Sequence, residues 1–162
     1  DTMHYLLGIV AAIILMSAYE VASISYLSPD STLKKETGHS VAVGLETLSG
    51  GYNSYLRANG AAPAALEDFA PSYTPLPPMP RNITASWRYG TAAGSPYVCL
   101  EGSIGEIEWA ALAGAVSRIG PRAERGTGTC ASFISAAPVS YPSPAAVRMF
   151  VGAGGMATGG VP

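Results

Sequence analysis

One long apolar run near the start of the chain limits most strongly what this sequence can fold into. From Met3 to Leu27 the only charged residue is Glu20. As an α-helix this run would be about 37 Å long, enough to cross about 30 Å of hydrocarbon. A helix that is apolar on every face needs lipid or other helices around it. We therefore expect residues 1–28 to form a transmembrane or filament-core helix, and residues 29–162 to form a globular domain.

The composition of the run indicates how it could pack. Gly8 and Ala12 are four residues apart, as are Ala18 and Ala22, and small residues at this spacing let helices approach closely. Glu20 is expected either at the solvated interface or paired with a neighbouring chain, where it would fix the register. The candidate membrane or assembly residues are Tyr5, Leu6, Gly8, Ile9, Ala12, Ile13, Met16 and Glu20.

Two other interpretations of the run are disfavoured. A signal peptide normally has Lys or Arg before its apolar core, and none precedes this one. A buried core helix would need a larger protein around it than the remaining Gly- and Pro-rich chain provides. The membrane orientation stays open, because Lys34 and Lys35 favour a cytoplasmic C-terminal side, whereas a disulfide in the domain would require the opposite side.

The charge content restricts the class of partner. Only 12% of the residues are charged and the formal net charge is -2, so the chain has no basic footprint for nucleic acid. Hydrophobic residues make up 48% of the sequence. A surface this poor in charge is expected to contact lipid or neighbouring copies of the same chain.

Cys99 and Cys130 are the only two cysteines. They can form one disulfide in an oxidising compartment, or remain two buried thiols. Neither belongs to a Cys-x-x-Cys pair or lies near a histidine, which disfavours zinc binding.

The region after the apolar run predicts a second helix, Ser31–Arg57. Its apolar residues follow helical spacing along one stripe, formed by Val41, Leu45, Leu48, Tyr52 and Tyr55. Four glycines between Gly38 and Gly51 are expected to weaken this helix, and Asn59-Gly60 to end it. Pro75–Pro80 predicts an extended surface loop.

The rest of the chain predicts a small sheet and one more helix. Trp87–Tyr89 and Tyr97–Leu100 predict two strands joined by a turn over Gly90–Pro96. Ser103 and Glu106 have the spacing of a capping box that opens a helix, which Gly120-Pro121 ends. A polar loop over Pro121–Thr129 and strands at Phe133–Ile134 and Val147–Val151 complete the prediction. The fold class is α+β, with the long apolar helix and a small antiparallel sheet.

No residue pattern predicts catalysis. His4 and His39 have no triad spacing with either cysteine, and Glu106 and Glu108 point to different faces of one helix. The glycine-rich stretch Gly152–Gly160 lacks the lysine and the following helix of a phosphate-binding loop. We therefore expect no enzymatic activity, no metal and no cofactor.

The layout as a whole resembles the type IV pilin-like proteins: an apolar helix, an amphipathic continuation, a Pro/Gly-rich connector and a small sheet domain. The stretch that ends the long helix in many pilins is similar to Tyr52, Tyr55, Asn59-Gly60, Pro63, Leu66 and Phe69. Cys99 and Cys130 resemble the disulfide that closes the C-terminal region of pilins. The resemblance implies a filament subunit held in the bacterial inner membrane before assembly and in an extracellular filament afterwards, with copies of itself or other pilus proteins as partners.

One departure from the family leaves a second resemblance open. Pilins usually carry a Glu near the processed N-terminus, whereas here the fifth residue is Tyr5 and the nearest acids are Asp1 and Glu20. The run from Met3, the region Trp87–Tyr97 and the run Pro142–Val151 look similar to PilM-type accessory proteins of conjugative thin pili. That resemblance implies an inner-membrane protein at the pilus base, with Met3 as its natural first residue.

Overall fold

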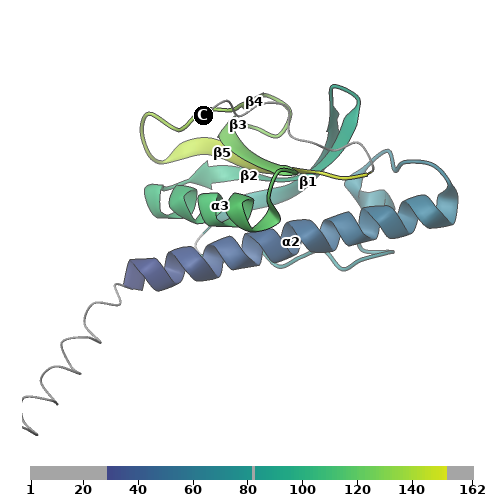
Figure 1. The fold of residues 1–162 in the computed structure, drawn as a ribbon, viewed down its shortest axis with the longest axis horizontal. Helices are drawn as coiled ribbons and strands as arrows, with labels where there is room; N and C mark the ends of the chain where they lie inside the picture. Colours follow the sequence, from purple (N-terminus) through teal and green to yellow (C-terminus); the bar gives the residue numbers. More distant parts are fainter. Residues whose placement is uncertain (1–28, 82, 153–162) are drawn as a thin grey trace, which may run out of the picture. The chain divides into compact units, whose positions relative to one another are not determined.

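The computed structural model describes residues 29–81 and 83–152. The predicted membrane helix, residues 1–28, lies outside this range. Within the described residues, no helix combines the length and the apolarity that a bilayer crossing needs. The described residues from Lys34 onward belong to one compact unit, in which helices pack on a five-stranded antiparallel sheet (Figure 1). The predicted α+β class and the antiparallel sheet are confirmed.

The sheet has the strand order β1-β2-β5-β3-β4, and each neighbouring pair is antiparallel. Strands β1 and β4 are therefore the two edges. The elements are, in chain order, α2 (Pro29–Asn59), the 3-10 turn η1 (Leu66–Asp68), β1 (Thr84–Ala92), β2 (Ser95–Ile104), α3 (Glu106–Ile119), β3 (Ala123–Gly128), β4 (Phe133–Ile134) and β5 (Ser143–Phe150).

Helix α2 buries the predicted apolar stripe. Val41, Leu45 and Leu48 are completely buried, and Tyr52 is nearly so. The helix ends as predicted at Gly60, whose φ of +70° is readily accessible to glycine. The N–H of Gly60 donates to the carbonyl of Leu56 at 2.8 Å. The 3.6-residue period of the sequence thus identified the buried face of this helix, and the Asn59-Gly60 pair identified its end.

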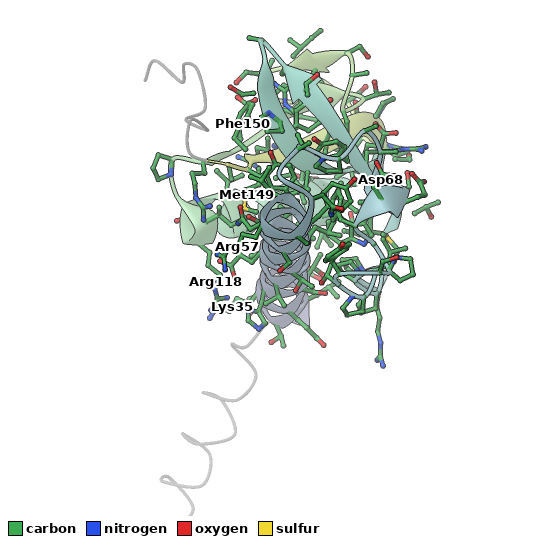
Figure 2. All side chains as sticks on the ribbon, turned by 90° about the vertical axis from the view of Figure 1, so that its right-hand side faces the viewer. Lys35, Arg57, Asp68, Arg118, Met149 and Phe150 are labelled. Atoms are coloured by element: carbon green, nitrogen blue, oxygen red, sulfur yellow. A yellow bond between two sulfur atoms is a disulfide. The ribbon has the colours of Figure 1, made fainter. Side chains whose placement is uncertain are left out.

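The two faces of the sheet carry separate apolar clusters, because neighbouring residues in a strand point to opposite sides. Met149 of β5 packs in the main core with α2 and α3, whereas the next residue, Phe150, lies in a smaller cluster on the far face (Figure 2). In β2, Val98 faces the main core and Cys99 the far cluster. Both helices therefore cover one face, and the segment after β3 covers part of the other.

The β1–β2 hairpin is longer than predicted. The expected turn over Gly90–Pro96 was wrong, because β1 continues to Ala92 and pairs directly with Ser95. Only Ala93 and Gly94 form the turn, and both have positive φ, 50° and 80°. A two-residue turn of this kind matches the twist of the flanking strands, so the ladder extends to the turn.

The predicted capping box was also wrong. Ser103 lies in β2, where it pairs with Thr84 on one side and Pro144 on the other. Since both neighbours hold Ser103 in extended backbone, helix α3 begins later, at Glu106. Its N-cap is Gly105, which provides no side-chain hydrogen bond.

The polar loop predicted over Pro121–Thr129 is instead strand β3, which lies between β5 and β4. Its sequence, AERGTG, lacks the apolar residues that mark a strand. Glu124 and Arg125 are accommodated because each has a specific partner: Glu124 pairs with Arg148, and Arg125 donates to the carbonyl oxygen of Trp109. Tertiary contacts here override local propensity.

Candidate functional site

The predicted assembly residues of the apolar helix, Tyr5 to Glu20, lie outside the described residues. The other predicted pair, Cys99 and Cys130, lies within them. These two cysteines form a disulfide with a Cα–Cα distance of 6.2 Å. Of the two alternatives left open by the sequence, the disulfide is confirmed.

Three side chains on one face of strand β2 hold Cys130 in place. Tyr97, Cys99 and Glu101 alternate along the strand and so point the same way. Beside the disulfide, the Tyr97 hydroxyl donates to the carbonyl oxygen of Cys130 at 2.8 Å. The N–H of Cys130 donates to Glu101 Oε2 at 2.7 Å. The segment that follows β3 is therefore fixed to β2 at its first buried residue, across the intervening strand β5.

Arg148 of β5 lies beside Cys99, on the face of the sheet that holds Cys130. It lies directly opposite Glu124 of β3 and forms an ion pair with it, with Nε–Oε1 at 3.0 Å. Its guanidinium carbon lies 3.9 Å from the ring centroid of Phe133. Both charged side chains are only 13% exposed. The pair is satisfied internally, which identifies Arg148 as a structural residue of the far face.

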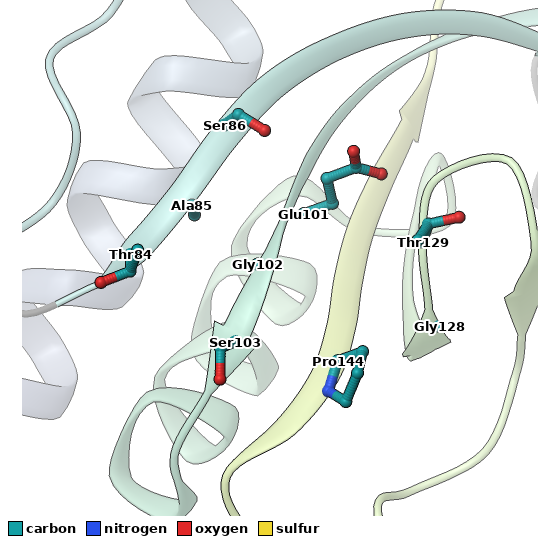
Figure 3. A pocket seen from close by; sticks show the side chains of 9 residues that line it. All are labelled: Thr84, Ala85, Ser86, Glu101, Gly102, Ser103, Gly128, Thr129 and Pro144. Atoms are coloured by element: carbon teal, nitrogen blue, oxygen red, sulfur yellow. The ribbon is translucent and has the colours of Figure 1, made fainter.

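Next to the attachment, the far face of the sheet has a shallow hollow of about 380 Å³. Figure 3 shows its lining, which comes from four strands and the residue after β3, and which is mostly small or hydroxyl-bearing: Thr84, Ala85, Ser86, Glu101, Gly102, Ser103, Gly128, Thr129 and Pro144. The carboxylate of Glu101 is already engaged, with Arg88 Nε at 2.9 Å and with the N–H of Cys130. The hollow therefore presents mostly apolar surface, and the carboxylate of Glu101 in its lining is already paired.

A second hollow, of about 500 Å³, lies between α2 and the proline-rich segment. Residues Glu36 to Thr47 line one side and Pro75 to Pro78 the other. Trp87 fixes the segment by donating from Nε1 to the carbonyl oxygen of Pro77 at 2.9 Å. Val43 and Leu76 remain exposed here, so this groove also presents apolar side chains to solvent.

The aromatic residues of β1, β2 and α3 pack in or against the apolar clusters, and Tyr89 among them is only partly buried. Trp87, Tyr97 and Trp109 are buried. Arg125 lies over the Trp109 ring, 4.2 Å from its centroid. Burial lowers the pKa of Arg125, an effect that the nearby Tyr141 opposes.

The remaining titratable groups do not gather. His39 Nδ1 lies 2.6 Å from Arg118 Nη1, a contact that joins α2 to α3 on the surface. In the part of the chain that the structure describes, no three His, Cys, Asp or Glu side chains are placed to hold a metal ion. What the described geometry offers is a set of contact surfaces: the two hollows and the edge of the sheet.

Comparison with models of protein families, with curated proteins and with solved structures finds no match to this chain. The chain's own sequence and geometry therefore carry the functional proposal.

Sequence reasoning missed Glu101, which holds both Arg88 and Cys130. The information was present in the alternation of the strand. Once Tyr97–Leu100 is predicted as a strand and extended by one residue, Glu101 falls on the same face as Cys99. A carboxylate beside a buried cysteine on that face needs partners, which the structure supplies.

Proposed function

We propose that this chain is a structural subunit of a type IV pilin-like surface filament. Its apolar segment, residues 1–28, anchors it in the bacterial inner membrane before assembly and packs in the filament core afterwards. In that transfer, contacts with lipid are exchanged for contacts with protein, so packing rather than hydrophobic transfer drives assembly.

The observation that carries the proposal is the way α2 is held. Its apolar stripe, from Val41 to Tyr52, is buried by one face of an antiparallel sheet, and the sheet is cross-linked by the Cys99–Cys130 disulfide. The sequence places the apolar run directly before this helix. A folded, cross-linked domain that follows an apolar segment is the arrangement that a filament subunit needs.

A second candidate is an inner-membrane accessory protein of the pilus base. The observation that favours it is the absence of any acidic residue between Asp1 and Glu20, where the pilin family usually carries its Glu. On this alternative the chain stays dispersed in the membrane.

The deciding experiment isolates native material, images it by electron microscopy and sequences its N-terminus. Filaments built from repeating copies of this chain would support the subunit proposal and exclude the accessory role. A membrane-dispersed protein that begins at Met3 would support the accessory role.

A matched pair of variants tests the role of Glu20 in register. Glu20→Gln should lower filament yield if the carboxylate pairs with a neighbouring chain. The control is Glu46→Gln, which makes the same change at an exposed position of α2. Equal filament yield from both variants would remove the register role of Glu20 but not the subunit proposal itself.

A further inference from the structure

The two edges of the sheet differ in their protection against pairing with another chain. Edge strands expose a row of main-chain N–H and C=O groups, and proteins usually shorten, charge or cover them. Strand β4 has only two residues, Phe133–Ile134. Strand β1 has nine, Thr84–Ala92. The short edge β4 therefore has few main-chain groups with which another strand could pair, whereas the long edge β1 has those of a complete strand.

The outer side of β1 has no main-chain partner among the described residues. Its ladder to β2 is continuous from Thr84–Ser103 to Ala92–Ser95, without a bulge. No other main-chain hydrogen bond of the described residues involves this strand. Every second residue of an antiparallel strand directs its N–H and C=O outward. These groups are available to an incoming extended strand.

The side chains of β1 do not block such a strand. The sequence TASWRYGTA contains no proline and one charge, Arg88. That charge is compensated within the same sheet by Glu101, at 2.9 Å. The devices that commonly protect an edge, which are proline, bulges and unpaired lysines, are therefore missing from β1.

We propose that β1 is a self-association edge, at which β1 of a second copy of this chain pairs antiparallel to form one continuous sheet across two domains. A second copy fits because the edge is self-complementary under a two-fold rotation about the sheet normal. With Trp87 opposite Trp87 of the second copy, Arg88 falls opposite Ser86 of that copy. The register centred on Arg88 would instead place two like charges face to face, which is unfavourable.

This contact goes beyond the proposed function and does not depend on it. A two-fold contact uses the same patch on both subunits, so it closes on itself and does not propagate a filament. In a filament-forming protein it would join heads of different filaments laterally. In a membrane-dispersed protein it would form a dimer.

The test uses the full chain in detergent micelles and compares three proteins: the reference, Ser86→Lys and Val139→Lys. Ser86→Lys puts a cation opposite Arg88 of the second copy. Within its own domain Ser86 lies opposite Glu101, so the lysine is tolerated there. Val139→Lys makes the same charge change on a fully exposed residue away from β1. Sedimentation velocity and amide hydrogen exchange of residues 84–92 are measured over a range of protein concentrations.

In the reference and in Val139→Lys, amide exchange in β1 should slow several-fold as concentration rises, together with a shift to a two-copy species. In Ser86→Lys both changes should disappear. Exchange in β1 that is independent of concentration in the reference, or that slows equally in Ser86→Lys, would overturn the proposal. If Ser86→Lys does not fold, Thr84→Lys replaces it, because position 84 is exposed and lies diagonally across from Arg88 of the second copy in this register. Filaments that form without β1 pairing would overturn this inference and leave the proposed function standing. Pairing of β1 without filaments would support this inference and not the proposed function.

Discussion

Gly44 of α2 lies directly against the indole ring of Trp87 on β1. A Cβ atom at position 44 would lie 2.5 Å from Cη2 of that ring and 2.6 Å from Cζ2. Real Cβ atoms do not approach carbon this closely, so the helix and the strand depend on a residue without a side chain. The same ring is anchored by its hydrogen bond to Pro77, which restricts how far it can move away.

Gly44→Ala should therefore destabilise the domain, although alanine is the better helix former. Alanine favours a helix over glycine by about 1 kcal/mol, but overpacking a core costs about 1–3 kcal/mol. We expect a net loss in the free energy of unfolding, measured by urea denaturation of the full chain in micelles. The matched control is Gly50→Ala in the same helix, where a Cβ would meet nothing within 4 Å.

Gly50→Ala should raise the free energy of unfolding by about 0.5–1 kcal/mol. If the two alanine variants were equally stable, the close contact between Gly44 and Trp87 would not be an energetic constraint.

These glycines also show what sequence reasoning could and could not predict. The stripe of α2 was predictable because apolar spacing reports burial directly. The glycines were expected to weaken the helix. Three of them, Gly38, Gly44 and Gly51, are also positions of close approach, where a Cβ would meet Ala111, Trp87 and Thr74 respectively. Propensity describes an isolated helix, whereas these residues respond to the partner that packs on it.

Strand β3 was beyond prediction for a related reason. Its two charged residues look like those of a solvated loop, and only the facing Arg148 and Trp109 make Glu124 and Arg125 compatible with a sheet. The contacts of the candidate site were likewise only partly predictable from the sequence. The disulfide was one of two alternatives that the sequence allowed, while the hydrogen bonds of Tyr97 and Glu101 to Cys130 depend on the sheet register.

Loss of the Cys99–Cys130 disulfide should lower stability substantially. The cysteines are 31 residues apart, and closing a loop of that length in the unfolded chain is worth about 3–4 kcal/mol in the chain-entropy model. We expect a corresponding fall in the free energy of unfolding of Cys99→Ser/Cys130→Ser, measured by urea denaturation.

Tyr97 and Glu101 should keep Cys130 in place even without the cross-link. Adding Tyr97→Phe leaves the Cys130 carbonyl without its donor and should cost about a further 1–3 kcal/mol. If Tyr97→Phe left the free energy of unfolding unchanged in the Cys99→Ser/Cys130→Ser background, the hydrogen bond would not persist without the disulfide.

The ion pair of Arg148 with Glu124 should matter far more than the pair of Arg88 with Glu101. In the first pair both side chains are 13% exposed, whereas Arg88 is 59% exposed. Removing one partner of a buried pair costs about 3–5 kcal/mol, and an exposed pair contributes about 0–1 kcal/mol. We expect Arg148→Ala to lower the free energy of unfolding by about 3 kcal/mol and Arg88→Ala by less than about 1 kcal/mol.

Salt provides a second measurement on the same two pairs. The contribution of the exposed pair should fall as ionic strength rises, and that of the buried pair should change little. Equal losses for the two alanine variants at all salt concentrations would contradict the difference in burial.

The alkaline limit of stability should depend in part on Tyr89. Burial raises the pKa of Tyr89, and the neighbouring Tyr52 and Asp68 raise it further. Below pH about 10, the ordinary tyrosine value, the folded and unfolded chains both keep this proton. Above it the unfolded chain loses the proton first, so the unfolded state binds fewer protons and stability falls as pH rises. Tyr89 is only partly buried, so the slope should stay well below the limit of about 1.4 kcal/mol per pH unit.

Tyr89→Phe should therefore flatten the fall in the free energy of unfolding above pH about 10, because the ring keeps its contact with Phe69 while the titrating hydroxyl is removed. Urea denaturation of both chains is measured at neutral pH, which gives the constant offset of the variant, and then at stepped alkaline pH. A steeper decline in Tyr89→Phe, or an identical slope after the offset is subtracted, would mean that other groups control the alkaline unfolding.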